Sequence, residues 1–107
     1  MPPVKYEHID FKPPASVADA ARAALQLRAS QPASKRGGTA VGVARARQLA
    51  NRQNVSPSTA RRMKAYFDRH EVDKQGETWD EQGKGYQAWM GWGGDEGYSW
   101  STAIVER

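Results

Sequence analysis

The sequence predicts a mainly α-helical protein, a small bundle of four to five helices with an extended proline-rich N-terminal arm. Apolar side chains recur at helical spacing in several segments, four of the six prolines fall within residues 1–15, and no alternating run is long enough to indicate a sheet. A chain of 107 residues suffices for one modest core. We therefore expect an arm at 1–15 and a single helical domain at 16–107.

The first two helices are predicted from their start signals and apolar stripes. Ser16 and Asp19 have the spacing of a capping box, so the first helix is expected to begin at Ser16. Its buried stripe contains Val17, Ala21, Ala24 and Leu25. The Pro, Ser and Gly content of 30–38 is typical of a flexible loop. A second helix over 39–50 would bury Val43, Ala46, Leu49 and Ala50 and leave Arg45, Arg47 and Arg52 facing solvent.

The third helix has the most complete set of local signals. Ser56 is a good N-cap and Pro57 suits the first helical position, where a missing N–H costs nothing. The helix is expected to end near His70. Its buried stripe is Ala60, Met63 and Phe67.

The C-terminal part is rich in tryptophan and glycine. A polar loop over 74–85 precedes a short helix over 86–92, and Asp95 is predicted to cap a last helix within 98–107. The large aromatic side chains should dominate the core of a chain with so few other large apolar residues. The expected aromatic core is Phe67, Trp79, Trp89, Trp92 and Trp100.

Composition excludes several classes of protein. The absence of cysteine excludes a disulfide scaffold and cysteine-ligated zinc. No apolar run approaches the roughly 18 residues of a bilayer span, and the first residues lack the apolar centre of a signal peptide. We therefore expect no membrane partner.

Charge is distributed unevenly along the chain. Residues 20–67 contain ten Lys or Arg and no acid, whereas 75–107 contain six acids and two bases. Such a division can give one face suited to polyanions. Pairing between the two halves, or between neighbouring copies, explains the same division equally well.

The stretch "LANRQNVSPSTARRMKAYF", residues 49–67, resembles the helix-turn-helix of repressors. Leu49 and Ala50 would belong to the first helix, Val55 would fill the corner, and Ser56 and its neighbours would face a DNA groove. Two residues depart from the motif: Asn54 stands where Gly is usual and Gln53 where an apolar residue is usual. Asn tolerates the left-handed conformation that the turn requires. A helical hairpin inside a packed bundle would show the same spacing without binding DNA.

A second resemblance covers about residues 16–105. The combination of "RGGT", "RHEVDK" and "WGGD" resembles a small uncharacterised domain family of tailed-phage genomes, found alone or attached to head-related proteins. The resemblance implies a phage setting and a virion-associated role. It carries no established chemistry to any residue.

No catalytic or metal site is predicted. In "RHEVDK", His70 and Glu71 are adjacent, so their side chains diverge by about 100° on a helix and are expected to close its end. "GWGGDEG" has glycines but no following Lys-Ser or Lys-Thr, and its acids would repel phosphate. We expect neither an enzyme nor a cofactor.

The leading hypothesis is a non-enzymatic phage structural or accessory protein, head-associated, that binds phage structural proteins or other copies of itself. It would occupy the bacterial cytoplasm during infection and then the virion. The expected arm anchors are Tyr6, Ile9 and Phe11. The alternative is a small basic helix-turn-helix protein that binds DNA. The candidate contacts for DNA or an acidic partner are Arg45, Arg47, Arg52, Ser58, Thr59, Arg61, Arg62 and Lys64.

Overall fold

The computed structural model describes residues 10–37, 39–77 and 79–106. These residues form five α-helices and two short 3₁₀ segments, and no strand occurs among them, which confirms the predicted fold class. The elements are α1 (Ala15–Ser30), η2 (Ala33–Lys35), α2 (Ala40–Ala50), α3 (Pro57–His70), η3 (Glu71–Gln75), α4 (Lys84–Gly91) and α5 (Gly94–Val105). None of the described helices combines the length and the apolar character that crossing a bilayer requires.

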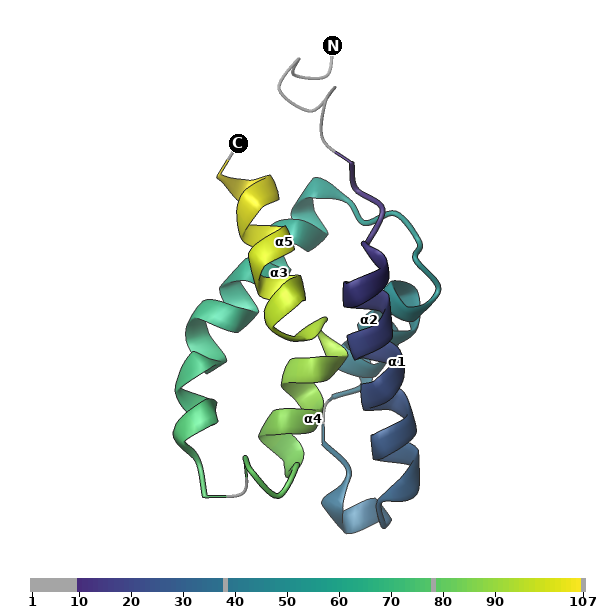
Figure 1. Cartoon of the computed structure of the whole chain (residues 1–107), viewed down its shortest axis with the longest axis vertical. Coiled ribbons are helices and arrows are strands. Elements are labelled where there is room, and N and C mark those ends of the chain that lie inside the picture. Colours follow the sequence, from purple (N-terminus) through teal and green to yellow (C-terminus); the bar gives the residue numbers. More distant parts are fainter. Residues whose placement is uncertain (1–9, 38, 78, 107) are drawn as a thin grey trace.

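The helices associate as two pairs joined by a short fifth helix. α1 packs along α2, and α3 packs along α5 (Figure 1). α4 lies mainly against α1 and also contacts α2 and α5, so it connects the pairs. The consecutive helices α2 and α3 make almost no direct contact. Most of the packing of α3 therefore comes from a helix that is far away in sequence.

The bounds predicted for α3 are confirmed, because all its signals are local. The Ser56 hydroxyl accepts a hydrogen bond from the Thr59 backbone N–H at 3.0 Å, and Pro57 occupies the first turn. The predicted stripe of Ala60, Met63 and Phe67 is completely buried. α2 is capped in the same way, because the Thr39 hydroxyl accepts from the Gly42 N–H at 3.1 Å.

The predicted start of α1 is wrong by one residue, and the predicted capping box does not form. α1 begins at Ala15 and Pro14 occupies the N-cap position, so Ser16 is already inside the helix. Pro14 has an extended backbone whose carbonyl accepts the first helical hydrogen bond, from Ala18 N–H at 3.0 Å. Asp19 instead pairs with Arg22 at 3.0 Å on the exposed face.

The last helix begins earlier than predicted. α5 starts at Gly94, and Asp95 lies in its first turn instead of capping it. Gly93 has φ +112° and closes α4 by donating its N–H to the Met90 carbonyl at 3.0 Å. Two glycines with positive φ thus let the chain leave one helix and enter the next without a loop.

Trp89 is the centre of the core, and the predicted cluster of four tryptophans is only partly correct. Trp89 is 1% exposed and contacts Phe67 edge to face with ring centroids 4.7 Å apart. Trp79 packs edge to face on Trp89 at 5.9 Å, and Trp79, Trp92 and Trp100 are all half-buried against this core. Two tyrosines that the sequence reasoning missed, Tyr66 and Tyr98, complete the aromatic packing.

The loop after α1 is held against α4 and is not the free connection predicted for 30–38. The buried Gln87 side chain accepts from the Gly37 N–H at 2.8 Å and donates to the Lys35 carbonyl at 3.1 Å. Arg28 donates its Nε–H to the Gly37 carbonyl at 2.9 Å. A Cβ on Gly37 would lie 2.4 Å from the Lys84 carbonyl oxygen, so only glycine permits this approach.

Replacing Gly37 by alanine is expected to lower the free energy of unfolding by about 1–3 kcal/mol, because the new methyl group meets backbone atoms of α4. Urea unfolding followed by circular dichroism measures the change. Gly85→Ala is the matched control: its Cβ has ordinary contact distances, the nearest being 3.5 Å to Asp73, and Ala is favoured in a helix. Equal unfolding midpoints for Gly37→Ala and the wild type would show that the loop is not held in this way.

Candidate functional site

The turn between α2 and α3 has a different geometry from the one expected for a helix-turn-helix. Arg52 adopts the left-handed conformation with φ +52°, and Asn54 does not. Arg52 N–H donates to the Leu49 carbonyl at 3.0 Å and Gln53 N–H to the Gln48 carbonyl at 3.1 Å. This pair of bonds is a Schellman end of α2. The left-handed residue therefore belongs to the helix end, two positions before the predicted site.

The last residues of the arm cover this turn. The Val55 N–H donates to the Phe11 carbonyl at 2.9 Å, and the Arg52 Nε–H donates to the Pro13 carbonyl at 2.9 Å. Phe11 packs against the core, and Pro13 is completely buried. Arg52 therefore fastens the end of the arm to the turn through its Nε–H, and its side chain is exposed. The other two proposed anchors, Tyr6 and Ile9, lie outside the described residues.

Trp92, from the end of α4, separates α2 from α3. Its ring stacks on Tyr66 of α3, with centroids 4.8 Å apart and planes 15° from parallel. On the other helix its Nε1 lies 3.4 Å from where a Gly42 Cβ would be. We call this inserted indole the Trp92 wedge. α2 and α3 therefore do not pack along each other as α1 and α2 do.

The predicted basic contacts fall into two groups. Arg47, Arg61 and Arg62 are exposed and form no ion pair with any residue that the structure describes. Lys64 pairs with Asp68 at 2.7 Å, and this hydrogen bond raises the pKa of Lys64. Arg45 is half-buried and not solvent-facing as predicted. The free positive charge of this face is therefore smaller than the sequence indicates.

The hydroxyl groups proposed to read bases are only partly available. Ser58 is exposed. The Ser56 hydroxyl donates to the Thr59 hydroxyl at 3.0 Å, so these two side chains are engaged in the cap of α3. Of the proposed base contacts, Ser58 alone has a side chain without a hydrogen bond to another described residue.

Side chains of the "RHEVDK" segment make contacts that stabilise the fold. α3 ends at His70, as expected, and the His70 ring stacks on Tyr66 at 4.5 Å while its Nδ1 lies 3.0 Å from Asp73. Lys74 Nζ contacts Asp95 at 2.7 Å and lies 4.6 Å from the centroid of the Trp89 ring. No group of three or more potential metal ligands occurs within 10–37, 39–77 and 79–106.

Asp95 connects three elements. It accepts from Lys74 of η3 and, at 2.9 Å, from the buried indole N–H of Trp89 on α4. The hydrogen bond from Lys74, and then that from Trp89, lowers the pKa of Asp95 below its ordinary value. A carboxylate in the first turn of α5 is also favoured by the helix dipole.

Asp68 plays a similar part between α3 and α5. The Tyr98 hydroxyl donates to the Asp68 carboxylate, which raises the pKa of Tyr98 to about 12. The hydrogen bonds from Lys64 and from Tyr98 lower the pKa of Asp68. Asp95 and Asp68 are thus both engaged in tertiary contacts, so these titratable residues have a structural role.

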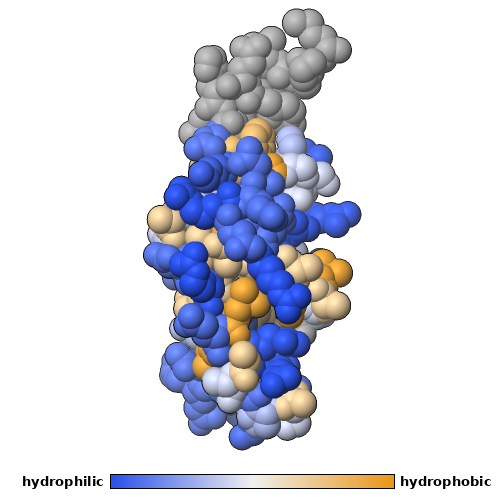
Figure 2. All heavy atoms as spheres, turned by 90° about the vertical axis from the view of Figure 1, so that its right-hand side faces the viewer, coloured by the Kyte–Doolittle hydropathy of each residue, from blue (hydrophilic) through white to orange (hydrophobic). Residues whose placement is uncertain are grey.

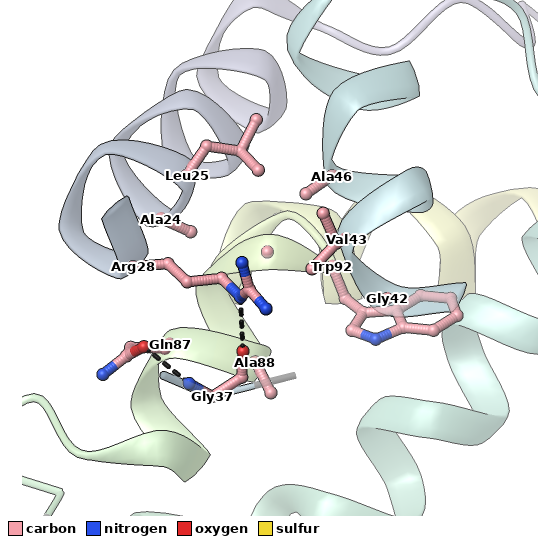
Figure 3. A pocket seen from close by; sticks show the side chains of 11 residues that line it. Ala24, Leu25, Arg28, Gly37, Gly42, Val43, Ala46, Gln87, Ala88 and Trp92 are labelled. Atoms are coloured by element: carbon pink, nitrogen blue, oxygen red, sulfur yellow. Dashed lines mark hydrogen bonds between the residues drawn. The ribbon is translucent and has the colours of Figure 1, made fainter. Parts of the chain in front are cut away.

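The cavities of the described chain are small or shallow. The space between α1, α2 and α4 has a volume of about 20 Å³, close to what one water needs, and Arg28 and Trp92 are among the side chains around it (Figure 3). A larger hollow of about 360 Å³ lies between η2 and the start of α4 and is lined by polar residues such as Lys35, Glu81 and Lys84. On the α1 side, Figure 2 shows apolar residues in separate small patches within a hydrophilic surface.

Comparison with known proteins gives no match: no family model, no curated protein and no solved structure is similar to this chain.

Replacing Asp95 by asparagine is expected to destabilise the protein by less than about 1 kcal/mol at pH 7, because the carboxylate is 70% exposed and solvent screens its pairing with Lys74. Since folding lowers the pKa of Asp95, its contribution is present above the ordinary value of 3.8 and is lost as pH falls through the folded value. Thermal unfolding from pH 7 to pH 2.5 should show the two proteins converging below pH 3.8. A difference that stays constant with pH would mean that the charge is not involved.

Proposed function

We propose that this chain is a non-enzymatic structural or accessory protein of tailed-phage particles, associated with the head. It would bind neighbouring structural proteins or further copies of itself. The proposal rests first on the resemblance of the "RGGT", "RHEVDK" and "WGGD" segments to a phage domain family. The contacts of these segments agree with the proposal, because each segment contributes contacts between two helices.

The use of the distinctive residues supports a binding role over a catalytic one. Gly37 permits the approach of the loop to α4, Lys74 reaches Asp95, and Gly93 joins α4 to α5. The groups that could do chemistry are thus employed in packing and in hydrogen bonds. The exposed arginine side chains of α2 and α3 suit recognition of an acidic surface.

The single structural observation that carries the proposal is the basic surface of α2 and α3, where the acid Asp68 is already paired with Lys64. Its arginines have no acidic partner in the described chain, while the acids of the C-terminal half are partly committed to their own contacts. An external acidic group is the natural complement of such a face.

Mass spectrometry of purified particles from the encoding phage tests the proposal. We expect the chain in virions at a copy number comparable to that of head components, and its loss when particles are disrupted and heads are removed. Abundant free protein in infected cells together with its absence from particles would contradict a structural role.

A second candidate function, binding of duplex DNA, is favoured by Arg47, Arg61 and Arg62, which are exposed and unpaired among the described residues. The separation of α2 and α3 removes the packing by which a helix-turn-helix presents its second helix to a groove. The candidate is therefore electrostatic binding to the phosphate backbone, with little dependence on sequence.

Replacing Arg61 and Arg62 together by glutamine should reduce the salt dependence of duplex binding. If each arginine contacts one phosphate, the slope of log affinity against log salt should fall by about 1.8. Lys64→Gln is the control, because Lys64 is already paired with Asp68, and its loss should change the slope less. Gel-shift titrations at several salt concentrations measure both. Equal effects of Lys64 and the arginine pair, or no binding at low salt, would remove this candidate.

A further inference from the structure

The Gln87 side chain fastens two separate segments of the chain to the start of α4. It is only 4% exposed, although it carries a polar amide. Its oxygen accepts from the Gly37 N–H at 2.8 Å, a bond that Figure 3 shows beside the cavity. Its nitrogen donates to the Lys35 carbonyl and to the Gln82 carbonyl, each at 3.1 Å. One buried amide therefore satisfies backbone groups both from the segment after α1 and from the segment before α4.

These two segments are turns with hydrogen bonds of their own. We call residues 31–37 the first loop and residues 79–83 the second loop. In the first loop the Lys35 N–H donates to the Pro32 carbonyl at 2.8 Å. In the second loop the Gln82 N–H donates to a carbonyl three residues earlier at 3.0 Å. A loop that is braced internally moves as a unit, so its opening depends on the bonds that fasten it to the helices.

The two loops are opposite walls of the hollow of about 360 Å³. Lys35 of the first loop and Glu81 of the second loop both line it, and so does Gln87. Since Gln87 is the buried member of this lining, it lies at the inner end of the hollow. The shape of the hollow is thus set by the side chain that holds both of its walls.

The three hydrogen bonds of Gln87 depend on one another. The bonds to Gly37 and Lys35 orient the amide, so that its second N–H points at the Gln82 carbonyl. When the first loop leaves α4, the amide oxygen and one N–H lose their partners within a buried site. A buried polar group without a partner is costly, so the side chain turns outward to water and releases the second loop as well.

We propose that the Gln87 side chain is a latch through which the first and second loops open and close as one unit. While its three bonds are made, the loops stand on either side of the hollow and Gln87 closes its inner end. Release of the latch frees both walls, so the hollow widens from both sides in a single step. This inference concerns a motion of the fold and does not depend on the function proposed above.

Native-state hydrogen exchange of the whole chain, followed by NMR, tests the coupling. The reporters are the backbone amides of Gly37 in the first loop and Gln82 in the second. Arg28→Met is the decisive variant, because the bond from the Arg28 Nε–H to the Gly37 carbonyl, at 2.9 Å, fastens the first loop alone. If the latch couples the loops, both reporters should exchange at least about tenfold faster than in the wild type, since the lost bond has a charged donor.

Arg22→Met is the matched control. Arg22 also lies on α1 and donates to a backbone carbonyl, that of Ala50, at 2.9 Å, and it pairs with Asp19. Its replacement removes the same kind of bond at a site away from both loops, so the two reporters should exchange as in the wild type. Amides in the middle of α5 report the loss of global stability, which both variants share. The second loop is therefore the readout that separates the variants.

Gln87→Met acts on the latch directly. It keeps the length of the side chain and removes all three hydrogen bonds, so it should accelerate both reporters by similar factors and by more than Arg28→Met does. If Gln87→Met fails to fold, the milder Arg28→Met still decides between coupled and independent loops.

Each outcome bears on the proposal. Acceleration of both reporters by Arg28→Met, with neither changed by Arg22→Met, supports the latch. Acceleration of the Gly37 amide alone by Arg28→Met would show that the loops open independently and would overturn it. Equal acceleration of the Gln82 amide by Arg28→Met and Arg22→Met would mean that the second loop opens only in global unfolding, which also overturns the latch.

Discussion

The burial of the Trp89 indole is the constraint on which the rest of the structure depends. A buried indole N–H needs an acceptor, and the Asp95 carboxylate supplies it from the first turn of α5. The same carboxylate accepts a hydrogen bond from Lys74, whose ammonium lies over the Trp89 ring. One side chain thereby fixes the relative positions of α4, α5 and η3. Phe67 packs edge to face against the ring, which brings α3 into the same cluster.

The Trp92 wedge has the opposite effect on α2 and α3. It lies between two helices that local sequence would place together, stacked on Tyr66 of α3 and close to Gly42 of α2. The adjacent sequence still looks like a DNA-reading unit because Leu49, Val55 and Met63 are buried in either arrangement. Their burial therefore cannot distinguish a helix-turn-helix from two helices with a third element between them. The distinction lies in Trp92, which is 25 residues beyond the end of the stretch 49–67.

Local signals were sufficient where no distant residue competed with them. The bounds of α3 follow from Ser56, Pro57 and an apolar stripe, all of which act within a few residues. The start of α1 was missed because Pro14 closes the helix end by its backbone, without the side-chain hydrogen bond that a capping box supplies. Asp95 was assigned to a cap because its partner Trp89 and the left-handed Gly93 are visible only in three dimensions.

The aromatic and basic residues also divide into those whose role follows from local sequence and those whose role depends on distant residues. Composition does not show which tyrosines join the core: Tyr66 is buried, whereas Tyr98 is half-buried and donates its hydroxyl to Asp68. The pairing of Lys64 with Asp68 follows from their spacing of four residues and was predictable. The use of Arg52 to hold the Pro13 carbonyl, 39 residues away, was not. The exposure of Arg61 and Arg62 could be predicted from the helical period alone.

The order of the helix pairs along the chain also governs how the protein can form during synthesis. α1 and α2 are neighbours in sequence and can associate as soon as both have left the ribosome. α3 emerges next but has no partner, because the helix that covers Met63 and Phe67 is α5, at the very end of the described chain. Throughout that interval the nascent protein presents its basic, acid-free part with an uncovered apolar stripe, beside the polyanionic RNA of the ribosome. The packing of α3 must therefore wait until α5 has left the ribosome, and deleting α5 would leave α3 without the surface on which it packs.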